Sequence, residues 1–128
     1  MKISLRSPAR AGFTIVELVI IITIIGLLVA IGVPNYMRAR DNSRLNFIYS
    51  NLREIENAKS QWALDNHKQT GDDVGALAQL GSYLRGGTVR DAIRETYTPN
   101  PVGTPAEANL PTGVQLGPFA AGSAIPAP

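Results

Sequence analysis

The sequence predicts a mainly α-helical protein: a long, bent N-terminal helix followed by a small C-terminal head with at most a small antiparallel sheet. Three observations favour this fold. Residues 13–33 include 16 apolar residues out of 21. Residues 35–67 contain no glycine or proline and repeat apolar residues at helical spacing. Residues 96–128 contain seven prolines and four glycines, which restrict strands to short pieces at sheet edges.

The first twelve residues carry a positive charge that the rest of the chain lacks. Lys2, Arg6 and Arg10 all precede Phe13, whereas the residues from Phe13 onward comprise nine basic and ten acidic ones. The overall charge of +2 is therefore no indication of nucleic-acid binding. The chain contains no cysteine, which excludes disulfides and thiol chemistry.

Residues 13–34 form the hydrophobic half of the predicted helix. As a helix, the 21 residues of the apolar stretch 13–33 span about 31 Å, enough to cross the hydrocarbon core of a bilayer. An ordinary signal peptide, cleaved near residues 30–32, would have a shorter apolar region. A passive membrane anchor would not need Glu17, because a carboxylate in hydrocarbon is costly and usually functional.

A family resemblance accounts for these features together. Residues 10–18 (RAGFTIVEL) resemble the processing motif of type IV prepilins, in which glycine precedes an aromatic residue and glutamate is fifth after the cut. The similarity continues to residues 30–36 (AIGVPNY). It implies that residues 1–12 are a leader, that prepilin peptidase cleaves between Gly12 and Phe13, and that the new amine of Phe13 is N-methylated. It also implies that Glu17 pairs with the Phe13 amine of a neighbouring subunit in a filament.

Gly26, Gly32 and Pro34 predict the weakest part of the helix. Proline has no amide proton and clashes with the carbonyl four residues earlier. The resemblance implies that this stretch bends or melts when a subunit leaves the membrane and joins the filament.

Residues 35–67 form the predicted amphipathic half of the helix. Its apolar residues recur at steps of three and four residues, which is typical of a helix packed on one side. The charged residues are expected to lie largely off this stripe. The stripe comprises Leu45, Ile48, Leu52, Ile55, Ala58 and Trp62, and the charged residues are Arg44, Arg53, Glu54, Glu56, Lys59 and Asp65.

The head divides into residues 68–95 and residues 96–128. We expect a helix over residues 74–84, with its start signalled at Thr70 or Asp72, and a further helical turn over residues 88–95. Residues 97–98 and 114–116 are candidate strands, and the chain from residue 120 is expected to be loose.

No residue set indicates catalysis, a metal or a cofactor. His67 is the only histidine and lies near the end of the predicted helix, where it suits the terminal carbonyls. Asp72 and Asp73 are better suited to capping than to holding a cation. The family's C-terminal cysteine pair and acidic calcium ligands are not transferred, since the chain has no cysteine and no Asp after Asp91.

These features predict a structural filament subunit, either a pseudopilin of a type II secretion system or a type IV pilin, rather than an enzyme. A minor pilin acting as a binding or tip module and a non-polymerising anchored domain are the alternatives. The resemblance implies as partners further copies of the chain, prepilin peptidase and an inner-membrane assembly platform, with no nucleic acid. The subunit is expected in the inner membrane as a single-pass protein and then in a periplasmic or extracellular filament.

Overall fold

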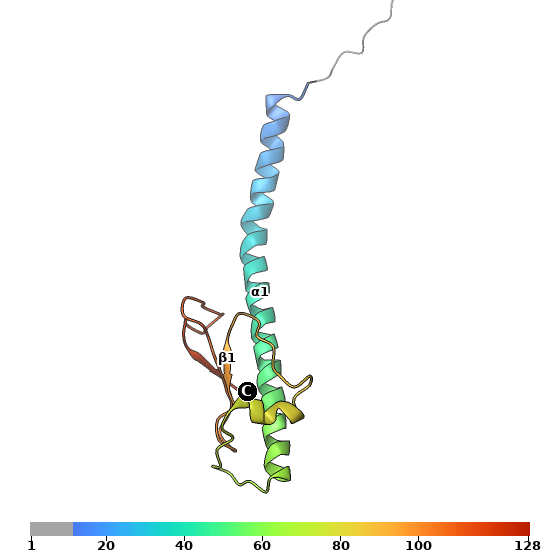
Figure 1. Cartoon of the computed structure of the whole chain (residues 1–128). Helices are drawn as coiled ribbons and strands as arrows, with labels where there is room; N and C mark the ends of the chain where they lie inside the picture. Colours follow the sequence, from blue (N-terminus) through green and yellow to red (C-terminus); the bar gives the residue numbers. More distant parts are fainter. Residues whose placement is uncertain (1–11) are drawn as a thin grey trace, which may run out of the picture. The chain divides into compact units, whose positions relative to one another are not determined.

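The computed structural model describes residues 12–128 and contains one long helix, one short helix and a three-stranded sheet (Figure 1). Helix α1 covers Ile15–Asp65, and the short 3-10 helix η1 covers Leu77–Tyr83. The chain divides into an N-terminal unit, Met1–Tyr36, and a C-terminal unit, Met37–Pro128. The predicted leader lies almost entirely outside the described residues.

The described part of the N-terminal unit is helical from Ile15 and has no core of its own. Every residue from Gly12 to Tyr36 is exposed. Helix α1 is the only described helix long and apolar enough to cross a membrane, by length and composition. An exposed apolar surface of this extent requires cover from lipid or from other protein.

The core of the C-terminal unit is built on the predicted stripe of α1. All six stripe residues are buried, and Ile48, Leu52 and Ile55 are completely inaccessible. Residues from the rest of the unit complete the core against them, including Leu80 of η1, Leu116 and Ile125. The helical periodicity of residues 45–62 therefore predicted the buried face of α1 correctly.

The end of α1 is stabilised by a backbone motif at His67. The amide of Lys68 donates to the carbonyl of Ala63 at 2.8 Å, and the amide of His67 donates to the carbonyl of Leu64 at 3.3 Å. This pair of bonds, with His67 in the left-handed region at φ 52°, is a Schellman C-cap. His67 therefore ends the helix through its backbone conformation, and the predicted interaction of its side chain with the terminal carbonyls stays a prediction.

The short helix expected over residues 74–84 is present, but as a 3-10 helix over Leu77–Tyr83. The expected start signal at Thr70 or Asp72 was wrong, because the N-cap residue is Ala76 and it makes no side-chain capping bond. Asp72 and Asp73 cap turns instead, accepting from the amides of Gln69 and Gly75 at 3.0 and 2.9 Å. Residues 88–95 form no helix, because local carboxylate bonds described below compete with helical ones.

The sheet comprises β1 (Thr96–Thr98), β2 (Glu107–Asn109) and β3 (Ala124–Pro126), all antiparallel in the order β1-β2-β3. Ala108 pairs with Tyr97 on one side and with Ile125 on the other. The prediction of a small sheet, with a strand at residues 97–98, is confirmed.

The end of the chain differs from the prediction. Residues 114–116 contribute only an isolated bridge between Leu116 and Phe119. The segment expected to be loose contains β3, whose Ile125 is fully buried. Pro126 is compatible with a strand here because β3 is at the edge of the sheet, where one missing amide is tolerated.

Candidate functional site

The predicted cleavage site lies just before the start of α1. Gly12 and Phe13 are outside the helix, and Phe13 is 77% exposed. Thr14 caps the helix: its Oγ1 accepts the amide of Glu17 at 3.2 Å, and its carbonyl accepts the amide of Leu18 at 3.2 Å. A free, non-helical backbone next to a capped helix is a suitable substrate for a peptidase.

Glu17 has a local role in addition to the predicted one. It is the third residue of α1, where a carboxylate is stabilised by the helix dipole. Thr14 and Glu17 match the T-x-x-E capping signature, so this second role of Glu17 could have been predicted from the sequence. Across residues 12–128 the Glu17 carboxylate has no hydrogen-bond or ion-pair partner, so it is available to a group from outside the described chain.

The predicted bend residues are all inside α1. The helix includes Gly26, Gly32 and Pro34 without a break. A side chain added at either glycine would meet no other atom of the chain within 4 Å. The glycines therefore satisfy no packing requirement within a single described copy, which is compatible with helix flexibility, with contact to other molecules, and with simple tolerance of glycine in a membrane helix.

The C-terminal unit contains a buried charge that the sequence analysis misplaced. Lys59 is 2% exposed, and its ammonium donates to Glu56 Oε1 at 2.8 Å and to the carbonyls of Pro99 and Thr104 at 2.9 and 2.6 Å. These bonds use all three donors of the group. Lys59 was expected off the apolar stripe, yet it follows Ile55 by four residues and precedes Trp62 by three, which is the spacing of the stripe itself.

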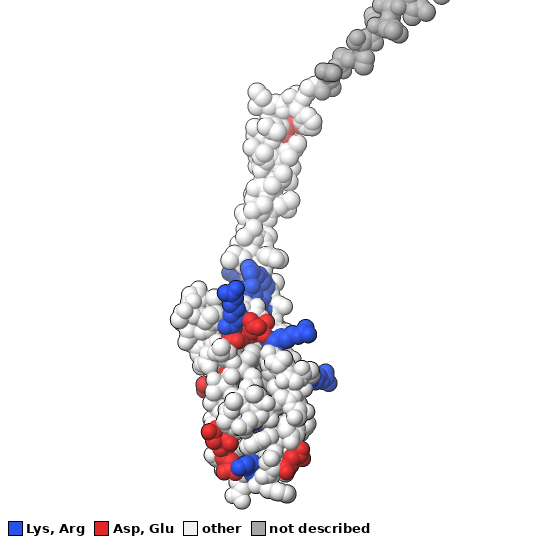
Figure 2. Space-filling model, viewed as in Figure 1, with Lys and Arg blue, Asp and Glu red and all other residues white. Residues whose placement is uncertain are grey.

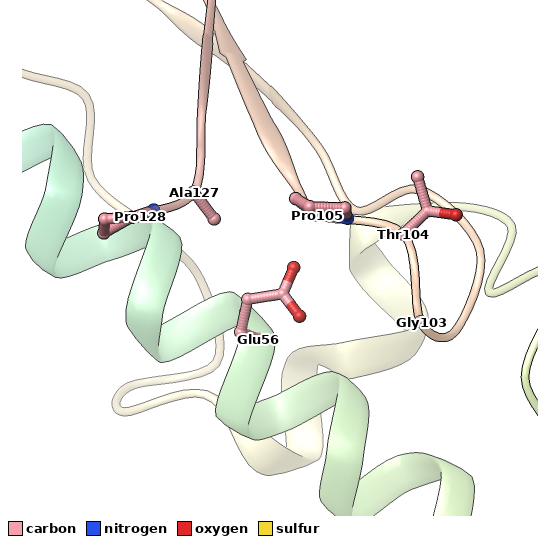
Figure 3. A pocket seen from close by; sticks show the side chains of 6 residues that line it. All are labelled: Glu56, Gly103, Thr104, Pro105, Ala127 and Pro128. Carbon is pink, nitrogen blue, oxygen red and sulfur yellow. The ribbon is translucent and has the colours of Figure 1, made fainter.

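A cavity of about 280 Å³ lies beside this ion pair (Figure 3). Glu56 is directed into it from α1, between residues 103–105 and residues 127–128. The Oε1 atom of Glu56 already accepts from Lys59 and from the amide of Ala106 at 2.6 Å. Glu56 has the one charged side chain of the lining, and it is engaged in holding the fold, so the cavity lacks the convergent free side chains of a ligand site.

A second polar network connects α1 to β1. The Asn51 amide donates to the carbonyl of Arg90 and to Tyr97 Oη, both at 2.8 Å, and Tyr97 Oη donates to Glu95 at 2.7 Å. Burial raises the pKa of the Tyr97 phenol, and the neighbouring Glu95 carboxylate raises it further. Burial alone would raise the pKa of Glu95, but hydrogen bonds from Tyr97 and from the amides of Ala92 and Ile93 outweigh it and lower that pKa.

No metal centre appears among the described residues. Within residues 12–128 no group of three or more His, Asp or Glu side chains is placed to hold a metal ion.

Comparisons with known proteins found one matching family and several relatives. Residues 7–33 match the family described as the prokaryotic N-terminal methylation motif. The type IV major pilin protein PilA of Myxococcus xanthus is 29% identical over 84 residues, which cover 64% of this chain and 38% of that protein. No solved structure matches the chain.

Two further relatives come from different assemblies. The type II secretion system core protein G of Klebsiella michiganensis is 30% identical over 76 residues, covering 59% of this chain and 54% of that protein. The type IV wide pilus major component PilA4 of Thermus thermophilus is 33% identical over 70 residues, covering 55% and 53%. The similarity thus spans about two fifths to one half of the length of these relatives.

Proposed function

Because this chain is a type IV prepilin-like protein, we propose that it is a structural subunit of a pilus-like filament and not an enzyme. One observation carries the proposal. The part of α1 that lies within the matched motif, residues 15–33, is apolar and exposed throughout, with Glu17 as its single charged residue. Lipid covers this surface before assembly, and the same helix of other copies covers it afterwards.

The proposed maturation occurs at residues 12–13. Prepilin peptidase cleaves after Gly12, removes the basic leader and frees the amine of Phe13, which is then N-methylated. The exposure of both residues outside α1 supports this step. Gly12 has no side chain to hinder entry of the backbone into a narrow protease site.

The proposed assembly contact joins the Phe13 ammonium of one subunit to Glu17 of the next. Burying either charge alone among apolar helices is costly, whereas the pair offsets part of that cost. The absence of a partner for Glu17 within residues 12–128 supports a contact between copies. Gly26, Gly32 and Pro34 let the helix bend or melt as the subunit leaves the inner membrane through an assembly platform.

The names of the relatives favour two possible assemblies for this subunit, a type II secretion pseudopilus and a type IV pilus. One is named as a secretion core protein and two as pilus components. The proposed subunit resides first in the inner membrane as a single-pass protein and then in a periplasmic or extracellular filament.

Mass spectrometry of the intact chain, purified from cells with its native peptidase, tests the maturation step. We expect a chain that starts at Phe13 and carries one added methyl group. A Gly12→Leu variant is expected to keep its leader, because the added side chain obstructs the scissile bond. A native chain that starts at Met1 or Val33 would contradict the proposal.

A further inference from the structure

Three arginines lie close together where the C-terminal unit begins. Arg38, Arg40 and Arg44 fall within seven residues of α1, and they are three of the nine basic residues found from Phe13 onward. Figure 2 shows basic side chains gathered at the end of the C-terminal unit that contains this part of α1, with an acidic group lying among them. Asp41 is the only acidic residue between Pro34 and Glu54. This group of three arginines is called the basic collar below.

The side chains of the collar are free within the described chain. Arg38 and Arg40 are exposed and Arg44 is half-buried. The single ion pair among residues 12–128 joins Lys59 and Glu56, and no guanidinium of the collar forms a hydrogen bond there. The collar therefore has no evident role in the stability of the C-terminal unit.

The collar surrounds the helix instead of forming one face. At about 100° per residue, Arg40 and Arg44 lie on one side of α1 and Arg38 lies on the other. Charges on both sides of a helix cannot all contact a groove or the flank of a neighbouring subunit. They can all contact a plane that crosses the helix axis, which is the geometry of a membrane surface.

The position of the collar along α1 matches the headgroup layer. Arg38 follows Val33, the last residue of the apolar segment, by five residues, or about 8 Å of helix. Arg44 follows it by about 16 Å, and side chains on a helix point back toward its N-terminus. The headgroup region extends roughly 5–8 Å beyond the hydrocarbon core. The arginine side chains at positions 38 and 40 therefore reach the lipid phosphates, and Arg44 lies just beyond the headgroup layer, where its charge adds to the attraction.

We propose that the basic collar binds anionic phospholipid headgroups on the membrane surface from which the C-terminal unit emerges. This inference rests on the proposed function, because it requires residues 13–33 to span the membrane before assembly. Guanidinium groups suit the site, since they bind phosphate through two parallel hydrogen bonds. The contact holds the unassembled subunit at a fixed depth until it is extracted.

Native mass spectrometry of the mature chain in detergent micelles tests the proposal. The micelles contain either phosphatidylglycerol or phosphatidylcholine, and the readout is the number of lipid molecules retained on the chain. We expect the parent to retain phosphatidylglycerol in preference to phosphatidylcholine. An Arg38→Gln/Arg40→Gln/Arg44→Gln variant should need about 100-fold more phosphatidylglycerol for the same retention, at about fivefold per arginine.

A matched control separates the collar from net charge. The Arg53→Gln/Lys68→Gln/Arg85→Gln variant removes three exposed charges elsewhere in the C-terminal unit. It should retain phosphatidylglycerol as the parent does. Equal retention of both lipids by the parent, or equal loss in the two triple variants, would overturn the proposal.

A protein partner would give a different result. If the collar instead binds acidic residues of a second copy, the collar variant would lose self-association in phosphatidylcholine micelles, with no change in phosphatidylglycerol retention, and the proposal would be wrong. Failure of filament assembly or cleavage in cells would overturn the proposed function but would leave the lipid counts unaffected.

Discussion

Lys59 shows how one charged side chain organises the C-terminal unit. Its ammonium connects α1 to the chain on either side of residues 100–103 through the carbonyls of Pro99 and Thr104. Glu56 extends the same connection to the amide of Ala106, which precedes β2. A buried ammonium with three oxygen partners thus fixes the glycine- and proline-containing loop between β1 and β2.

Replacing Lys59 with Met should lower the free energy of unfolding by about 3 kcal/mol. Met fills a similar volume but leaves Glu56 and two carbonyls without their donor, and breaking a buried ion pair is strongly destabilising. Denaturant unfolding of the mature chain in micelles, followed by the fluorescence of its single tryptophan, Trp62, measures the change. An Arg53→Met control on the exposed side of α1 should change stability by less than about 0.5 kcal/mol. A similar loss in both variants would refute the special role of Lys59.

Residue-level prediction succeeded where a local pattern determines the structure. The apolar stripe is visible in a short window of sequence and is buried as predicted. The prepilin resemblance is carried by a similarly short motif and is supported by the family match over residues 7–33, while cleavage at Gly12-Phe13 stays a prediction. Lys59 was misplaced because its charge was taken as evidence of exposure, although its spacing put it on the buried face. Its carbonyl partners lie 40 and 45 residues away, and no local pattern indicates contacts at that separation.

At the scale of elements, residues 88–95 show why a helical segment was predicted and did not form. The Glu95 carboxylate accepts from the amides of Ala92 and Ile93 at 2.8–3.0 Å, and also from Tyr97 Oη. These bonds hold the backbone in a turn that leads directly into β1. Strand β3 was missed for a related reason: its pairing with β2 comes from residues 107–109, far earlier in the chain.

The lowered pKa of Glu95 makes the stability of this turn depend on pH. In the unfolded chain Glu95 has its ordinary pKa of about 4.5, and in the folded chain its pKa is lower. The free energy of unfolding is therefore raised fully by the Glu95 carboxylate at pH values above 4.5. This stabilisation is lost as the pH falls through the folded pKa. A Glu95→Gln variant should be less stable at pH 7 and should lose less stability on acidification. Denaturant unfolding at pH 7 and pH 3 gives both values, and parallel losses in the two proteins would contradict this assignment.

At the scale of the whole molecule, the two units have opposite relations to water. The C-terminal unit encloses a core of apolar residues, although Met37, Phe47 and Leu64 are exposed, whereas the N-terminal unit exposes all of its described apolar residues. This contrast could be predicted from the sequence alone, because hydropathy and the prepilin motif can both be recognised in short stretches of sequence. The small sheet and the 3-10 helix depend on tertiary contacts, and only their approximate content could be predicted.

The assembly role of Glu17 is the central claim, and filament yield from a strain whose only copy carries Glu17→Ala tests it most directly. The variant should still insert, because an unfavourable charge is removed, and should still be cut after Gly12. Sheared filaments should be lost or greatly reduced, since a neighbour's Phe13 ammonium loses a buried partner worth roughly 3–5 kcal/mol. Glu17→Asp, which keeps the charge on a shorter side chain, should give an intermediate yield. Filaments from the Glu17→Ala strain in parental amounts would contradict the account.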